Sequence, residues 1–139
     1  PATTEGFTEE SMNYEQIKKR FDELTSGEPK KVQALKNIGL QNACKGALSK
    51  ACKGDENRKL VTIALTGKSS TKDFTLNEWY ALFCFVFPKD EHGEFIFKNP
   101  VTNKWEGREE LTAWCGAVFT HLAEQEGQLK MFEVAHAES

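Results

Sequence analysis

Nine consecutive apolar or aromatic residues, from Trp79 to Phe87, constrain the fold of this chain more than any other feature. So dense a run must be buried, either in the chain's own core or against a partner, because contact between apolar surface and water is unfavourable. Thr75 and Glu78 have the spacing of a capping box, and Pro88 follows the run. We therefore predict a helix over residues 76–87, with a strand as the alternative because the run is rich in β-branched and aromatic residues.

Apolar residues that recur at helical spacing predict three further helices. The first covers residues 13–25. The second covers residues 29–52 and is interrupted at Gly39. The third covers residues 108–126 and has Gly127 at the position of its C-cap.

Two other segments have the patterns of non-helical structure. Residues 60–66 are rich in β-branched residues and precede Gly67, which predicts a short strand after a polar loop over residues 53–59. Turn signals on both sides of residues 94–97 indicate a hairpin or a long ordered loop. The predicted fold class is mainly α, a small helical domain of about four to five helices with a minor β-hairpin or short sheet. An α+β fold is the alternative.

The length of the chain, 139 residues, is that of one domain. We expect residues 1–12 to form a flexible N-terminal arm, residues 13–127 a single helical-core domain, and residues 128–139 an acidic, weakly helical C-terminal tail. A basic segment followed by an apolar one is absent from the N-terminal region, so we expect no signal peptide. Nine apolar residues are far fewer than the roughly twenty that a membrane-spanning helix needs, so we expect no membrane partner and a cytoplasmic location.

The four cysteines, Cys44, Cys52, Cys84 and Cys115, do not have the spacing of a metal site. The sequence contains neither a C-x-x-C nor an H-x-x-x-H motif, and its three histidines are scattered. Two of the cysteines lie in strongly apolar segments, where a free thiol packs as a small hydrophobic group. We expect core cysteines with reduced thiols, no metal and no cofactor.

Catalytic motifs are also absent. Gly67-Lys68-Ser69 matches the end of a phosphate-binding loop, but Thr62 stands where that motif requires its first glycine. Burial of Cys84 and Cys115 is expected to raise the pKa of each thiol, which disfavours a nucleophilic thiolate. We therefore expect a protein that is not an enzyme.

The charges of the chain are divided between its two halves. The formal net charge is only −3, but residues 30–72 hold ten basic and two acidic residues, and residues 77–139 hold five basic and eleven acidic ones. The first segment therefore carries +8 and the second −6. An anionic partner responds to the local charge and not to the net charge, so the basic segment is the positive functional signal in this sequence.

We predict that this basic segment binds nucleic acid by neutralising phosphates. The candidate nucleic-acid-binding residues are Lys45, Lys50, Lys53, Arg58, Lys59, Lys68 and Lys72. No aromatic residue lies between Lys30 and Lys72, so this segment alone offers no platform on which bases can stack. The alternative is a lysine-rich face that is solvated and binds no partner.

The predicted function is non-enzymatic: binding of nucleic acid, single-stranded RNA or DNA, together with self-assembly into a homo-oligomer, as in a nucleocapsid or coat protein. Polar arms around a helical core with a basic inner segment are similar in layout to helical viral coat proteins, although no motif is shared. Adjacent basic and acidic halves suit head-to-tail association. The alternative is a monomeric protein-interaction module or inhibitor that acts through an aromatic or acidic surface.

Overall fold

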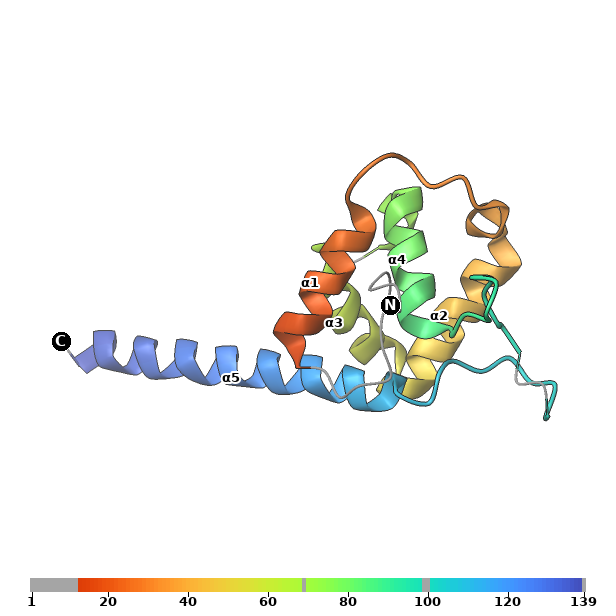
Figure 1. The fold of residues 1–139 in the computed structure, drawn as a ribbon. Helices are drawn as coiled ribbons and strands as arrows, with labels where there is room; N and C mark the ends of the chain where they lie inside the picture. The colour runs from red at the N-terminus through yellow and green to blue at the C-terminus, as the bar shows by residue number, and fades with distance from the viewer. Residues whose placement is uncertain (1–12, 69, 99–100, 139) are drawn as a thin grey trace.

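A computed structural model describes residues 13–68, 70–98 and 101–138, and of residues 126–138 it describes the backbone alone. Within these residues the chain forms five α-helices and two short 3₁₀-helices (Figure 1). They are α1 (Tyr14–Thr25), η1 (Gln33–Lys36), α2 (Ile38–Cys52), α3 (Asp55–Thr66), η2 (Thr71–Asp73), α4 (Leu76–Val86) and α5 (Leu111–Glu138). The predicted mainly α fold is confirmed. The predicted arm over residues 1–12 lies outside the described residues.

The apolar run forms the central helix of the fold. The Thr75 hydroxyl accepts a hydrogen bond from the Glu78 amide, and the Glu78 carboxylate accepts one from the Thr75 amide, which completes the predicted capping box. Every residue from Glu78 to Phe87 is buried. Helices α1 and α2 and the short η1 pack against α4, which occupies the middle of the molecule in Figure 1. The helix prediction for this run is confirmed, and Val86 is its last helical residue.

The first two helices begin at asparagine caps. The Asn13 side chain accepts from the Gln16 amide at 2.9 Å, and α1 starts immediately after it, as predicted. The helix predicted from Pro29 was placed too early. Asn37 caps α2 by accepting from the Leu40 amide, so the helix begins at Ile38. The residues before it form an extended connection and η1. The predicted interruption at Gly39 does not occur, since α2 is continuous from Ile38.

The strand predicted over residues 60–66 is wrong, because these residues form the second half of α3. The helix begins at Asp55, inside the predicted polar loop, and its acidic first turn suits the positive end of the helix dipole. Val61, Thr62 and Leu65 are buried on one side of the helix, which is helical spacing and not strand alternation. Gly67 then adopts a left-handed conformation, with φ of 78°, and ends the helix.

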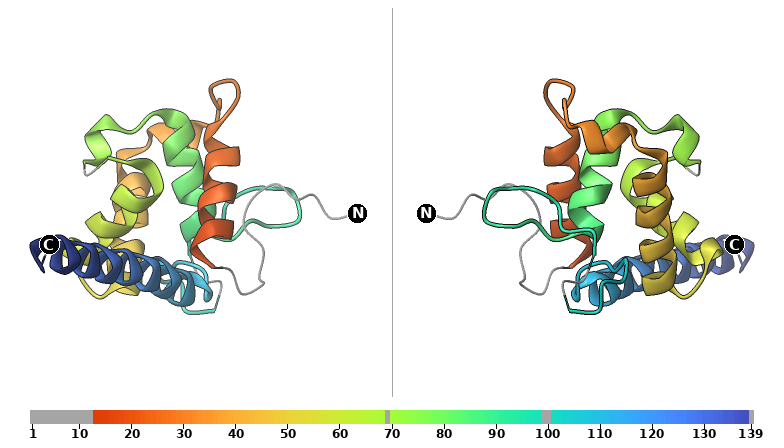
Figure 2. Two further views of the ribbon diagram at one scale, coloured as in Figure 1. Left: turned by 90° about the vertical axis from the view of Figure 1, so that its left-hand side faces the viewer. Right: turned by 90° about the vertical axis from the view of Figure 1, so that its right-hand side faces the viewer.

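Helix α5 is longer than predicted at its C-terminal end. It begins at Leu111, packs on α1, α2 and α3, and continues through Gly127 to Glu138. The C-cap predicted at Gly127 is therefore wrong: the glycine is tolerated inside the helix at a cost of about 1 kcal/mol relative to alanine. Figures 1 and 2 show α5 passing beneath the other helices and extending well beyond them.

A long ordered loop connects α4 to α5, and the described residues of this loop do not include a β-hairpin. Two isolated antiparallel bridges, Lys89 with Phe95 and Lys98 with Trp105, replace the predicted hairpin. The Phe97 ring lies 5.9 Å from the Phe83 ring of α4 and 5.0 Å from the ring of its C-cap, Phe87, between centroids, so the loop is anchored on the aromatic residues of this helix and its cap. Among the described residues, no helix is long and apolar enough to span a membrane.

Candidate nucleic-acid interface

Helix α2 has two contrasting sides. Cys44, Leu48 and Cys52 follow one another at four-residue spacing and are buried in the core. The opposite side borders an open groove of about 710 Å³. The groove is lined by Asn37, Gly39, Leu40, Asn42, Ala43, Gly46, Ala47, Lys50 and Trp105. All of these residues except Trp105 belong to α2 or its N-cap.

The groove exists because its floor consists of small residues. Gly39, Ala43, Gly46 and Ala47 leave little side chain above the helix backbone. An added Cβ at Gly46 would meet no atom within 4 Å, so the space over the middle of the helix is open. An extended ligand can therefore approach the α2 backbone closely.

Trp105 forms the wall of the groove and comes from the loop before α5. Its ring centroid is 6.3 Å from that of Phe97, which packs in turn on the aromatic residues of α4. The bridge between Trp105 and Lys98 holds the backbone, and Lys98 Nζ lies 4.8 Å from the centre of the indole ring. The side chain nevertheless remains 49% exposed. A fixed, half-exposed indole with a cation over one face is suited to stacking against a planar group.

The two segments that border the groove contain only positive charges. Residues 29–54 hold six lysines and no acidic residue, and residues 98–105 hold two lysines and none. Lys50 lines the groove directly, and Lys53 is exposed just beyond the end of α2, where its own left-handed conformation (φ of 63°) forms the C-cap. An anion in this groove therefore meets Lys50 directly and the positive local charge of both segments.

The structure brings together only part of the predicted binding set. Lys50 lines the groove near the C-terminal end of α2, Lys53 follows as the exposed C-cap, and Lys45 is half-buried on the flank of the same helix. Lys59 is exposed on α3 and forms an ion pair with Glu56 at 3.8 Å. Lys72 is exposed in η2. The assignment of these lysines to phosphate binding stays a prediction.

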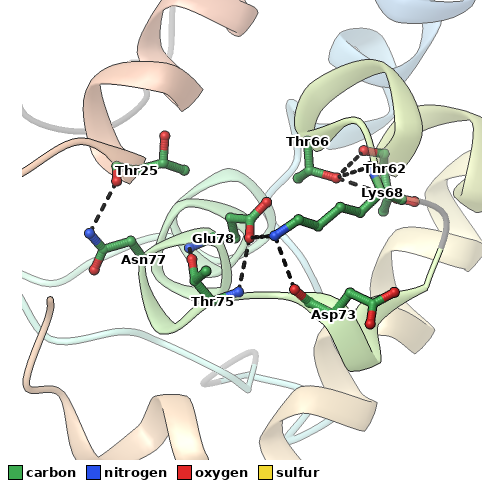
Figure 3. A network of polar contacts seen from close by, with 8 residues as sticks. All are labelled: Thr25, Thr62, Thr66, Lys68, Asp73, Thr75, Asn77 and Glu78. Atoms are coloured by element: carbon green, nitrogen blue, oxygen red, sulfur yellow. Dashed lines mark hydrogen bonds and ion pairs between the residues drawn. The ribbon is translucent and has the colours of Figure 1, made fainter.

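Lys68 is occupied by contacts inside the protein. Its Nζ donates to Glu78 Oε1 at 2.5 Å and to the Asp73 carbonyl at 3.0 Å (Figure 3). Burial raises the pKa of Glu78, but the hydrogen bonds from Lys68 and Thr75 outweigh this effect and hold the pKa below its usual value of 4.5. The arrangement ties the end of α3 to the start of α4. Lys68 therefore stabilises the junction of these helices.

Arg58 points towards the core side of α2. Its side chain is 13% exposed, and its Nε is buried without a hydrogen bond, 3.9 Å from Asp55 Oδ1. The positive charge acts on the thiols of Cys44 and Cys52, whose ionised forms it favours. Arg58 is thus placed beside buried thiols and away from the groove.

Sequence reasoning missed Trp105, the groove residue contributed by the loop, and Lys98, whose Nζ lies over its indole ring. Their signal in the sequence was weak: a single tryptophan between polar residues, far from the basic segment. No aromatic residue lies between Lys30 and Lys72 in the sequence, but the fold places the Trp105 ring beside α2, in the same groove as Lys50.

The described part of the chain contains no group of three His, Cys, Asp or Glu side chains able to hold a metal ion. No family model, no curated protein and no solved structure matches the chain.

Proposed function

We propose that this protein binds single-stranded nucleic acid in the groove between α2 and Trp105. One observation carries the proposal: a half-exposed indole, with Lys98 over its ring, faces a groove that Lys50 also lines. Stacking platforms flanked by cations are the usual means by which proteins hold single strands without reading their sequence.

Each part of the groove would contact a different part of the ligand. An unpaired base stacks on Trp105, which a base within a duplex cannot do without leaving its own stack. Lys50 and Lys53 neutralise the neighbouring phosphates, and the release of counterions makes affinity fall with increasing salt. The small residues along α2 admit the sugar-phosphate backbone. Single strands are thus favoured over duplexes.

The self-assembly part of the proposal is supported by α5. A helix of 28 residues is about 42 Å long, and its C-terminal half extends beyond α1, α2 and α3, on which the helix packs. Helices usually owe their stability to a packed face and not to propensity alone. We propose that a second copy of the chain covers this half, and the net negative charge of residues 123–139 suits a basic surface on that copy.

Fluorescence anisotropy with a labelled single-stranded oligonucleotide tests the binding proposal. We expect salt-dependent binding to both RNA and DNA strands, quenching of tryptophan emission, and weak competition by duplex DNA. Absence of binding at low salt would overturn the proposal.

Size-exclusion chromatography with light scattering tests assembly, with and without the oligonucleotide. We expect particles larger than one chain. A chain that stays monomeric, ignores nucleic acid and retains one defined protein partner would favour the alternative, a protein-interaction module.

A further inference from the structure

Two buried thiols from distant parts of the chain meet in the core. Cys52 is the last residue of α2, and Cys115 lies in the second turn of α5. Their Sγ atoms are 3.3 Å apart, and the Cys52 thiol donates a hydrogen bond to Cys115 Sγ. Cys52 is 2% exposed and Cys115 is fully buried. A disulfide needs the two sulfurs at about 2.05 Å, so they must approach by little more than 1 Å to bond.

Cys52 has the more acidic thiol of the two. In its ionised form it accepts a hydrogen bond from Cys115, which holds the pKa of Cys52 below its usual value of 9.0, against the opposite effect of burial. The Arg58 guanidinium acts in the same direction as the hydrogen bond. The same hydrogen bond and burial raise the pKa of Cys115. Cys44, also near Arg58, has its pKa raised because burial dominates.

The position of Cys52 gives it a route to solvent. It occupies the final turn of α2, next to Lys53 and Gly54, which reverse the chain with positive φ angles. Helix ends open more readily than helix centres, so transient fraying of this turn exposes the Cys52 sulfur to a small reagent. Cys115 needs no such exposure, because its partner sulfur is already in contact with it.

We infer that Cys52 and Cys115 form a thiol–disulfide exchange site whose reagent is a low-molecular-weight disulfide such as oxidised glutathione. The Cys52 thiolate attacks one sulfur of the reagent, a mixed disulfide forms, and one thiolate of the reagent leaves with the bonding electrons. Cys115 then attacks the Cys52 sulfur and expels the second thiolate. The protons released by the two cysteines end on the two departing thiols. The protein loses two hydrogens, and the reagent is reduced by two electrons.

The product would be a covalent link between α2 and α5. It would close a loop that contains α3, α4 and the groove-forming Trp105, because all of these lie between residues 52 and 115. Closing so long a loop restricts the unfolded chain, so we expect the oxidised protein to melt at a higher temperature than the reduced one. This inference does not depend on the proposed nucleic-acid binding.

Peptide mapping of the full chain tests the inference. Reduced protein is incubated with oxidised glutathione, the remaining thiols are alkylated in denaturant, and the digest is analysed by mass spectrometry. We expect one intramolecular peptide pair joining Cys52 to Cys115, two alkylated cysteines, and a melting temperature that returns to its reduced value after dithiothreitol. The Cys44→Ser variant should keep the cross-link, and Cys52→Ser should lose it.

Mapping of the unaltered chain needs no variant, so a substitution that prevents folding does not obscure the result. Four alkylated cysteines after incubation would show that the pair is only a packed contact and would overturn the inference. A disulfide that joins other cysteines or two chains, or a glutathione adduct that remains on Cys52, would overturn it as well.

Discussion

Lys68 and Glu78 form an ion pair that joins the end of α3 to the first turn of α4, with the lysine side chain 35% exposed and the glutamate side chain 11% exposed. Replacement Lys68→Met keeps the aliphatic stem and removes the charge. We expect the free energy of unfolding to fall by about 1–2 kcal/mol, because the Glu78 carboxylate is left buried without its cation. Urea denaturation measures the change.

Lys72→Met is the matched control, since Lys72 is exposed in the neighbouring η2. Its effect should stay within about 0.5 kcal/mol. Equal stability losses in the two variants would mean that the ion pair with Glu78 contributes nothing specific.

The same ion pair makes stability depend on pH. The folded-state pKa of Glu78 lies below its usual value of 4.5. The stability that the ionised carboxylate contributes is therefore fully present above pH 4.5 and is lost as the pH falls through the lower, folded-state pKa. We expect the urea midpoint of the unaltered protein to decrease between neutral pH and about pH 3. The Glu78→Gln variant should be less stable at neutral pH and should lose less stability on acidification. Parallel pH profiles for the two proteins would contradict the assignment.

The sequence predicted most reliably what local chemistry determines. The spacing of Thr75 and Glu78 predicts where α4 starts, and the structure contains the capping box that this spacing implies. The strand prediction for residues 60–66 failed because β-branched residues favour strands only weakly, and packing of α3 against α2 and α5 overrides that preference. The C-cap prediction at Gly127 failed because a single glycine weakens a helix without ending it.

The candidate site was only half visible in the sequence. Lys50 and Lys53 stood out because residues 30–72 hold ten basic residues and only two acidic ones. Trp105 did not, because its place beside α2 depends on Phe97 and on the aromatic core beneath it, which are tertiary contacts. A charge count also cannot tell a lysine that faces solvent from one such as Lys68, whose partner is fixed by the packing of two helices.

Gly46 offers a test of the open floor of the groove. It lies inside α2, and an added Cβ would meet no atom within 4 Å. We therefore expect Gly46→Ala to raise the free energy of unfolding by about 0.5–1 kcal/mol, from the better helix propensity of alanine. Gly107→Ala should do the opposite, because its Cβ would come within 2.9 Å of Leu111 and 3.0 Å of the Val86 carbonyl. Thermal denaturation of both variants measures the contrast, and the same sign for both would refute it.

Trp105 should contribute to binding without contributing much to stability. We expect Trp105→Ala to weaken binding of a single-stranded oligonucleotide by about 1–3 kcal/mol, the usual contribution of one stacked base. Trp105→Phe keeps an aromatic face and should lose less. Because the indole is 49% exposed, both variants should unfold near the midpoint of the unaltered protein. Unchanged affinity in Trp105→Ala, measured by anisotropy, would show that no base stacks on Trp105.

Lys50 and Lys53 should determine how steeply binding depends on salt. Each phosphate contact on a single strand contributes about 0.7 to the slope of log affinity against log salt concentration. We expect Lys50→Gln and Lys53→Gln each to reduce the slope by about that amount and the double variant by the sum, because the two side chains neutralise different phosphates. Anisotropy titrations over a range of salt concentrations give the slopes.

Lys19→Gln, at an exposed position of α1 outside the groove, is the control and should leave the slope unchanged. If all three single variants lowered the slope equally, the ligand would be responding to the total charge of the protein, and the groove would have no special part in binding.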